Sequence, residues 1–139
     1  MNKVVCGIDI SGSTASVIIF TGAKNDFNVK KTKLTKIMLQ DDKNQNSVHS
    51  FLQTFENFIR QENVDKIGIK GRATSGQFSG GCLSFKIEGL IQSMNSEVNI
   101  INANSISSKF KKASINTESY DIFKYQIDAF KTAYYLLED

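Results

Sequence analysis

Apolar residues in the first 39 positions form three short runs that are separated by turn-forming residues. The first run, residues 3–10, is apolar on both faces, which is typical of a central strand. Residues 14–20 predict a second strand, and the alternation over residues 27–39 predicts one long edge strand. Because the connections are short and contain glycine or asparagine, we expect these strands to form an antiparallel meander.

The later apolar positions mostly repeat with the spacing of helices. A first helix is predicted after a cap at Asn46 or Ser47, and short strands are predicted at residues 66–70 and 97–101. Further helices are predicted from Leu83 to Met94, over residues 106–112 and near the end of the chain. The apolar positions that define the first and last helices are Phe51, Leu52, Phe55, Phe58 and Ile59, and Phe123, Ile127, Phe130, Tyr134 and Leu137.

This order of elements predicts an α/β fold with a five-stranded mixed sheet: three antiparallel strands, then two that join in parallel. Strands that are linked through helices join a sheet by right-handed crossovers, which places helices on both faces. Residues 1–139 suit a single domain of common size. Seven residues on predicted inward faces are expected to be buried: Ile8, Ile18, Phe55, Ile69, Ile87, Ile100 and Ile127.

Composition restricts the class of protein without identifying its function. Hydrophobic residues make up 40% and charged residues 22% of the chain, as in ordinary globular proteins. No apolar run approaches the length that spans a membrane, and the N-terminus does not resemble a signal peptide, so we expect a cytoplasmic protein with no membrane partner. The net charge of +3 permits contact with nucleic acid but does not require it. Cys6 and Cys82 have no metal-binding or redox spacing and are interpreted as two buried, reduced thiols.

Asp9 is the most informative residue because it lies within an otherwise apolar strand. A carboxylate in such a position is costly unless it is paired, hydrogen-bonded or bound to a metal. One interpretation is a functional site, and the other is a structural carboxylate that caps the turn at residues 11–13. The sequence leaves both open.

A second candidate site is the glycine-rich segment that follows the predicted strand at residues 66–70. Its backbone N–H groups, together with Lys70, Arg72, Thr74, Ser75 and Gln77, offer donors and cations to a phosphate group. The alternative interpretation is a crossover loop whose glycines let the next helix begin close to the sheet.

The order of elements and the segment Gly7-Ile8-Asp9-Ile10-Ser11-Gly12-Ser13 resemble the ribonuclease-H-like superfamily, and within it the RuvC-type Holliday junction resolvases. The loop from Gly71 to Gly81, followed by Phe85-Lys86-Ile87-Glu88, resembles an uncharacterised bacterial family of the same fold. This resemblance implies carboxylates that converge on two divalent metal ions and cleave a phosphodiester.

Only part of that carboxylate set is present. The resemblance implies Asp9 and Asp128 as catalytic residues and as ligands for a weakly bound Mg²⁺, with Asp128-Ala129 and Ala133 matching the end of the RuvC-type motif. Tyr125 stands where that motif has an earlier acid, and Gly71 stands where a Glu is expected. For Asp128 the alternative is a solvated helix face with Lys124 and Lys131 beside it.

We therefore predict a nucleic-acid-associated, RuvC-like domain with an incomplete metal site. If it is an enzyme, the resemblance implies a Mg²⁺-dependent nuclease. The alternative is a non-enzymatic protein-interaction module with a degenerate site. A homodimer is one form that such a module can take. A fold alone does not decide between these, because one fold hosts many functions.

Overall fold

A computed structural model describes residues 3–72 and 81–138 of the chain. Within these residues one mixed sheet contains β1 (Lys3–Ser11), β2 (Thr14–Ala23), β3 (Asp26–Lys30), β4 (Lys36–Met38), β5 (Lys66–Lys70) and β6 (Val98–Ile101). The strand order is β3-β2-β1-β5-β6, and β4 also pairs with β2. β2 is antiparallel to β1, β3 and β4, whereas β5 is parallel to both β1 and β6, which confirms the predicted meander and crossovers.

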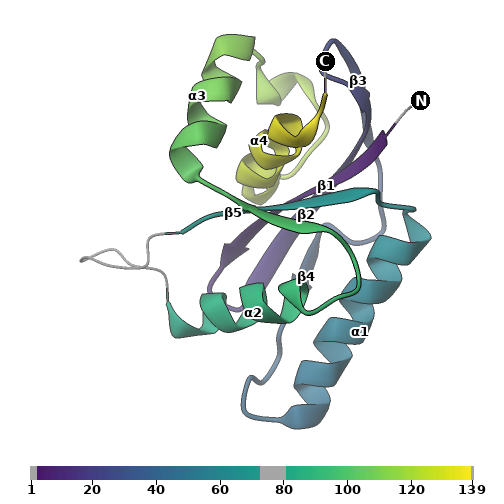
Figure 1. Cartoon of the computed structure of the whole chain (residues 1–139), viewed down its shortest axis with the longest axis vertical. Helices are drawn as coiled ribbons and strands as arrows, with labels where there is room; N and C mark the ends of the chain where they lie inside the picture. Colours follow the sequence, from purple (N-terminus) through teal and green to yellow (C-terminus); the bar gives the residue numbers. More distant parts are fainter. Residues whose placement is uncertain (1–2, 73–80, 139) are drawn as a thin grey trace.

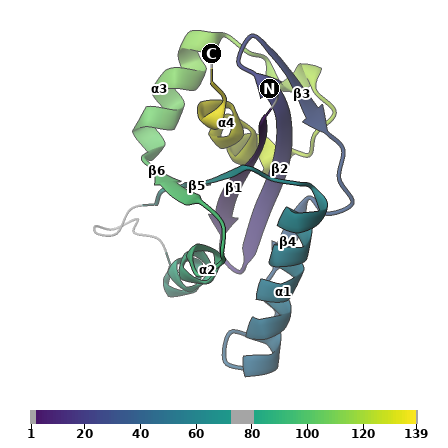
Figure 2. The same cartoon turned by 45° about the vertical axis from the view of Figure 1, so that its right-hand side comes forward.

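Helices cover both faces of this sheet, as the element order predicted (Figure 1). α1 (Gln45–Gln61) and α2 (Cys82–Gln92) lie on one face, and α3 (Ala103–Ala113) and α4 (Ile127–Leu136) lie on the other. Two short 3₁₀ turns, η1 (Thr117–Ser119) and η2 (Lys124–Gln126), connect α3 to α4. The rotated view in Figure 2 shows the same two layers on opposite sides of β1 and β2. No helix in the described part of the chain is both long and apolar enough to cross a membrane.

Alternation along the strands divides the core into two layers. In β1, Cys6, Ile8 and Ile10 pack beneath α1 and α2, whereas Val5 packs beneath α3 and α4. The expected core residues Ile8, Ile18, Phe55, Ile69 and Ile87 are buried, and Ile127 is half-buried. The prediction for Ile100 is wrong, since 44% of its surface is exposed. Its neighbour Ile101 points into the α3/α4 layer, so Ile100 takes the opposite face at the open edge of the sheet.

The predicted strand over residues 27–39 is divided into β3 and β4, which share one edge of β2. Register pairs Ile19 with Lys30 and Ser16 with Lys36, so residues 31–35 stand opposite residues 17 and 18 alone. The surplus residues leave the ladder, in the manner of an enlarged β-bulge. The ladder resumes where the Val17 N–H donates to the Thr35 carbonyl over 2.9 Å.

Two further expectations are corrected at the ends of helices. Phe123 lies outside the last helix and is 57% exposed, because its extended backbone precedes a 3₁₀ turn that the Gln126 side chain stabilises by accepting from the Phe123 N–H. Cys82 is the first residue of α2 and is exposed, so the expectation of a buried thiol is wrong at this position. Cys6 is buried as expected, and burial raises the pKa of its thiol to about 12.

Candidate functional site

A row of four side chains crosses the sheet near the C-terminal end of β1. The register pairs Asp9 of β1 with Ser16 of β2, and Ser16 with Lys36 of β4. The parallel register of β1 with β5 places Lys70 beside Asp9 on its other side. Because partners in register project to the same face of a sheet, the four side chains lie on one face, the one covered by α4.

The close approach of α4 to β1 brings a second carboxylate to this row. A Cβ on Gly7 would lie 2.2 Å from the carbonyl oxygen of Ala129 and 2.5 Å from the backbone nitrogen of Ala133. Only a residue without a side chain allows a helix to pack so closely on a strand. Gly7 therefore sets the position of the first turn of α4, which carries Asp128.

Asp9 is a half-buried carboxylate in an unfavourable environment. Burial raises the pKa of Asp9 above its ordinary value, and the negative charge of Asp128 raises it further, while Lys70 and Arg72 act in the opposite direction. In the part of the chain that the structure describes, the Asp9 carboxylate accepts no hydrogen bond. This removes support for the interpretation in which Asp9 caps the turn, and leaves a half-buried charge that is offset by the nearby cations Lys70 and Arg72.

Lys70 forms an ion pair inside the same cluster. Its Nζ lies 3.2 Å from Oδ2 of Asp128, and the two side chains are 30% and 45% exposed. The Lys70 ammonium group thus partly neutralises both carboxylates, which would otherwise attract cations from solution. Asp128 is also in the first turn of α4, where the helix dipole favours a negative charge.

The residue of β5 that faces Asp9 is Lys70 and not Gly71, the position at which the resemblance implies a Glu. Gly71 lies one residue beyond the strand, where its N–H donates to the Ile101 carbonyl over 2.7 Å. A Cβ added to Gly71 would approach that same carbonyl oxygen at 3.0 Å, away from β1. A cation, in place of a carboxylate, therefore occupies the site-facing position on this strand.

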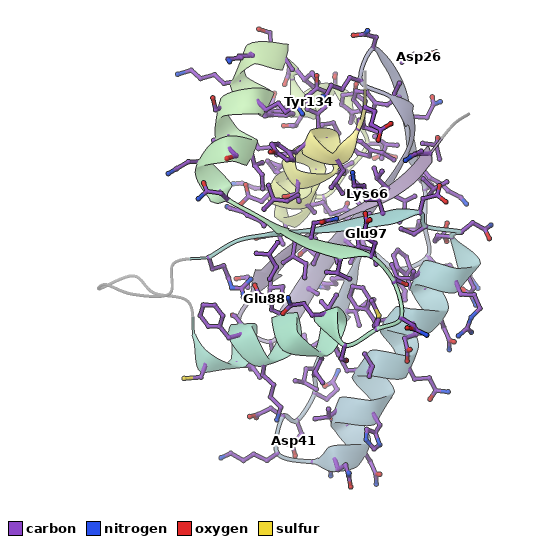
Figure 3. All side chains as sticks on the ribbon, in the orientation of Figure 1. Asp26, Asp41, Lys66, Glu88, Glu97 and Tyr134 are labelled. Atoms are coloured by element: carbon purple, nitrogen blue, oxygen red, sulfur yellow. The ribbon has the colours of Figure 1, made fainter. Side chains whose placement is uncertain are left out.

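Arg72 is held by α2. Its Nη2 lies 2.8 Å from Oε1 of Glu88, and the two side chains are only 12% and 13% exposed. The same guanidinium donates to the Ser84 carbonyl and lies over the ring of Phe85. Figure 3 shows Glu88 on the side of α2 that faces the sheet. Arg72 thus ties the end of β5 to α2, and removing one partner of such a buried pair costs about 3–5 kcal/mol.

The sequence from residue 3 to residue 136 matches a family described as "Protein of unknown function (DUF3010)". The chain belongs to the DUF3010 family. No individual curated protein matches it. The match covers both the Asp9 cluster and the segment that contains Arg72 and Glu88, so the family comprises the whole fold described above.

Solved structures that are similar to this chain over almost its whole length include RuvC and a poxvirus resolvase. The structure of Thermus thermophilus RuvC aligns with a TM-score of 0.71 and 8% identity, covering 95% of this chain and 92% of that one. The complex of that RuvC with a Holliday junction substrate aligns with a TM-score of 0.69 and 9% identity, covering 96% and 91%. Fowlpox virus resolvase with substrate Holliday junction DNA aligns with a TM-score of 0.53 and 14% identity, covering 94% of this chain and 93% of that one. The ribonuclease-H-like fold, inferred from the element order, is thereby confirmed.

The predicted site residues fall into three groups. The structure brings Asp9, Asp128 and Lys70 together, and it holds Arg72 beside them against α2. Thr74, Ser75 and Gln77 lie outside the described residues. Tyr125, at the place of the missing acid, turns to the edge of the sheet, where its hydroxyl lies 2.5 Å from Oγ1 of Thr35.

The donor set does not fit a pair of divalent metal ions. Within residues 3–72 and 81–138, no three side chains of His, Cys, Asp or Glu gather where they could hold a metal. Asp9 and Asp128 supply two carboxylates, and Lys70 and Arg72 place positive charge next to them. Two ions about 3.5–4 Å apart need more negative charge than this cluster provides.

Sequence reasoning missed two members of the row, Ser16 and Lys36, and the partner of Arg72, Glu88. Ser16 is buried among apolar residues of β2, and such a position is the signal that could have identified it. The sequence does not show that Lys36 lies beside Ser16, because this pairing depends on where the predicted edge strand divides into β3 and β4. Glu88 was named only in the motif that follows the glycine-rich loop, and its ion pair with Arg72 depends on how α2 lies against the end of β5.

Proposed function

We propose that this chain is a nucleic-acid-binding domain of the ribonuclease-H-like fold that does not cleave by the two-metal mechanism. The observation that carries the proposal is the Lys70–Asp128 ion pair beside Asp9. A protein cation pairs with one of the two carboxylates that the resemblance implies as metal ligands, which supports a cluster that holds charge without binding two metals. Weak, single-site binding of Mg²⁺ through Asp9 or Asp128 is compatible with this arrangement.

Three features support nucleic acid as the ligand. Lys70 is 30% exposed at the cluster and can exchange Asp128 for a phosphate oxygen. The chain has a net charge of +3, with 17 Lys and Arg against 14 Asp and Glu. Two of the similar structures are described as complexes with Holliday junction DNA, and the proposal extends that ligand class to this chain.

The binding test compares Lys70→Gln with Lys66→Gln. Both lysines belong to β5 and differ by an even number of positions, so they share a face of the strand but lie at opposite ends. We expect the wild type to bind junction, duplex or single-stranded DNA with an affinity that falls steeply as salt rises. Lys70→Gln should weaken binding and reduce the salt slope by about one, whereas Lys66→Gln should have little effect. Equal affinities for all three proteins, or no binding to any nucleic acid, contradict the proposal and favour a protein-interaction module.

The cleavage test uses the same substrates with Mg²⁺ or Mn²⁺, and runs Asp9→Asn beside the wild type. We expect no robust turnover from either protein. Strong cleavage that Asp9→Asn abolishes would overturn the non-cleaving half of the proposal. Cleavage that is unchanged in Asp9→Asn would indicate a contaminating nuclease. Further purification should then remove that cleavage from both proteins.

A further inference from the structure

A stacked aromatic pair is exposed between the sheet edge at β4 and the start of α4. The rings of Phe123 and Tyr125 lie nearly parallel, with centroids 5.2 Å apart and planes 6° apart. Phe123 is 57% and Tyr125 is 39% exposed. Scattered exposed apolar residues are common, but two aromatic rings stacked on each other in water form a surface that is suited to a flat ligand.

Interactions with neighbouring residues fix the pair in place. The Tyr125 hydroxyl is hydrogen-bonded to Thr35, and the Lys36 ammonium lies 5.0 Å from the centre of the Tyr125 ring. The Phe123 N–H donates to the buried side chain of Gln126 over 3.0 Å. A ligand that stacks here therefore meets rings that are already ordered, which lowers the entropy cost of binding.

Phe123 also forms one wall of a pocket. This pocket has a volume of about 450 Å³ and reaches down to Ile18 and Val29, with Lys31, Thr32 and Ser119 among its other lining residues. Its volume is within the range of roughly 300–1,000 Å³ for small-molecule sites. An aromatic wall, an apolar floor and hydroxyl groups match the face, body and polar edge of a nucleobase.

The charge around the pocket is complementary to a phosphate backbone. Residues 31–36 (KTKLTK) contain three lysines and no acidic residue, while the preceding Lys30 is already paired with Glu62 over 2.9 Å. Lys31 pairs with Asp121 over 2.5 Å, but both side chains are at least 80% exposed, and exposed pairs of this kind exchange readily for other anions. Within the described part of the chain, Lys33 and Lys36 form no ion pair.

The same segment disfavours a second copy of the chain as the occupant. A sheet edge invites strand pairing when it is long and regular, whereas breaks and lysines prevent it. Here the edge is interrupted between β3 and β4, and the interruption contains Lys31 and Lys33. A ligand that provides flat rings and negative charge fits this surface better than another strand.

The geometry points to this pocket as a site for an unpaired nucleotide of a single-stranded or locally opened nucleic acid. The base stacks on Phe123, and the flanking phosphates lie on Lys31, Lys33 and Lys36. Aromatic platforms with lysines beside them bind single strands with little sequence preference, because every base has a stacking face. This inference rests on the proposed function and specifies which form of nucleic acid the domain selects.

The test measures the affinity of fluorescein-labelled single-stranded, duplex and four-way-junction DNA of matched length by anisotropy. We expect Phe123→Ala to weaken single-strand binding by about fivefold or more, with duplex binding unchanged. Tyr125→Phe keeps the ring but removes the hydroxyl that bonds Thr35, so its loss of affinity should be smaller than that of Phe123→Ala. The matched control is Ile100→Ala, which removes an exposed apolar side chain at the opposite edge of the sheet.

A second measurement reports stacking directly. A single 2-aminopurine in the oligonucleotide should lose fluorescence on binding the wild type, and lose much less with Phe123→Ala or Phe123→Leu. The leucine variant preserves apolar contact, so it separates stacking from general packing if the alanine variant folds poorly. Circular dichroism spectra that match the wild type establish that each variant is folded.

Different failures identify which idea is wrong. Absence of binding to every nucleic acid overturns both the proposed function and this inference. Salt-dependent binding that Lys70→Gln weakens but Phe123→Ala does not affect overturns the inference alone. Competition by thymidine 5′-monophosphate as strong as that by the oligonucleotide would assign the pocket to a free nucleotide. A dimer in sedimentation that Phe123→Ala dissociates, with nucleic-acid affinity unchanged, would assign the surface to self-association.

Discussion

Individual charged residues decide what the site can do. Asp9 on β1 and Asp128 on α4 match positions that the resemblance to RuvC-type resolvases implies, yet Lys70 on the neighbouring strand β5 changes their chemistry. Burial raises the pKa of Asp9, so its charged form lowers the stability of the folded protein. Carboxylates with raised pKa values are common at functional positions. This cost can be measured.

The first prediction is that Asp9→Asn stabilises the folded protein at neutral pH. The unfolded pKa of an Asp is about 3.9, and the folded pKa of Asp9 is higher. The folded state therefore binds the proton more tightly, and the wild type loses stability as pH rises from the unfolded pKa through the folded one. Urea unfolding of both proteins should show an advantage for Asp9→Asn that grows across this interval and vanishes below it. A less stable Asp9→Asn at neutral pH would mean that attraction to Lys70 outweighs burial.

The second prediction concerns the cation at the centre of the cluster. Lys70→Glu places a third carboxylate beside Asp9 and Asp128, so the variant should be less stable without metal and be restabilised by Mn²⁺. A ligand that binds only the folded state adds about 2.7 kcal/mol at a hundredfold excess over its Kd. Thermal melts with and without MnCl₂ measure the effect, and Lys66→Glu on the same strand is the control. An equal response of both variants to Mn²⁺ would show that Lys70 does not occupy a metal-compatible position.

At the scale of elements, the site depends on how α4 lies on β1. The helix crosses the strand at Gly7 with backbone atoms closer than any side chain would allow, and this contact carries Asp128 to Asp9. On the other side of the sheet, α2 is joined to the end of β5 through Arg72 and Glu88. These two contacts set the geometry of the cluster from opposite faces.

We therefore predict that Gly7→Ala destabilises the protein and separates Asp128 from Asp9. Overpacking of this kind typically costs about 1–3 kcal/mol, because the helix must move away from the sheet. The control is Gly89→Ala in α2, where no atom lies within 4 Å of the added Cβ. That change should be neutral or stabilising by up to about 1 kcal/mol. Urea denaturation checks both, and a Gly7→Ala protein as stable as the wild type would contradict the observed packing.

For the whole molecule, a single sheet connects two helical layers. β1 and β2 contribute residues to the core beneath α1 and α2 and also to the core beneath α3 and α4. A shared sheet couples the two cores, because neither layer can separate without exposing strand residues of the other. We propose on this ground that residues 1–139 unfold as one domain.

This coupling gives a prediction that two spectroscopic signals can test. The chain has four tyrosines and no tryptophan, and the tyrosines lie between Tyr120 and Tyr135, in the α3/α4 layer or at its edge. Phe55→Ala, in the α1 layer, should cost about 3–5 kcal/mol. The midpoint of urea unfolding should shift by the same amount whether it is measured by tyrosine fluorescence or by far-ultraviolet circular dichroism. Phe130→Ala is the matched change in the other layer, and a tyrosine midpoint unmoved by Phe55→Ala would indicate two independent units.

The sequence determined much of this protein, because apolar periodicity encodes burial directly. It predicted the antiparallel strands at the start of the chain, the later parallel strands, the helices on both faces and a carboxylate, Asp9, within the central strand. Tertiary structure decided what periodicity does not contain. The choice between Lys70 and Gly71 depends on the register of β5 against β1, and the division of the edge strand depends on its register against β2. The exposure of Phe123 and the approach of Asp128 to Asp9 depend on where α4 begins and how closely Gly7 lets it pack, which are contacts between residues far apart in the chain.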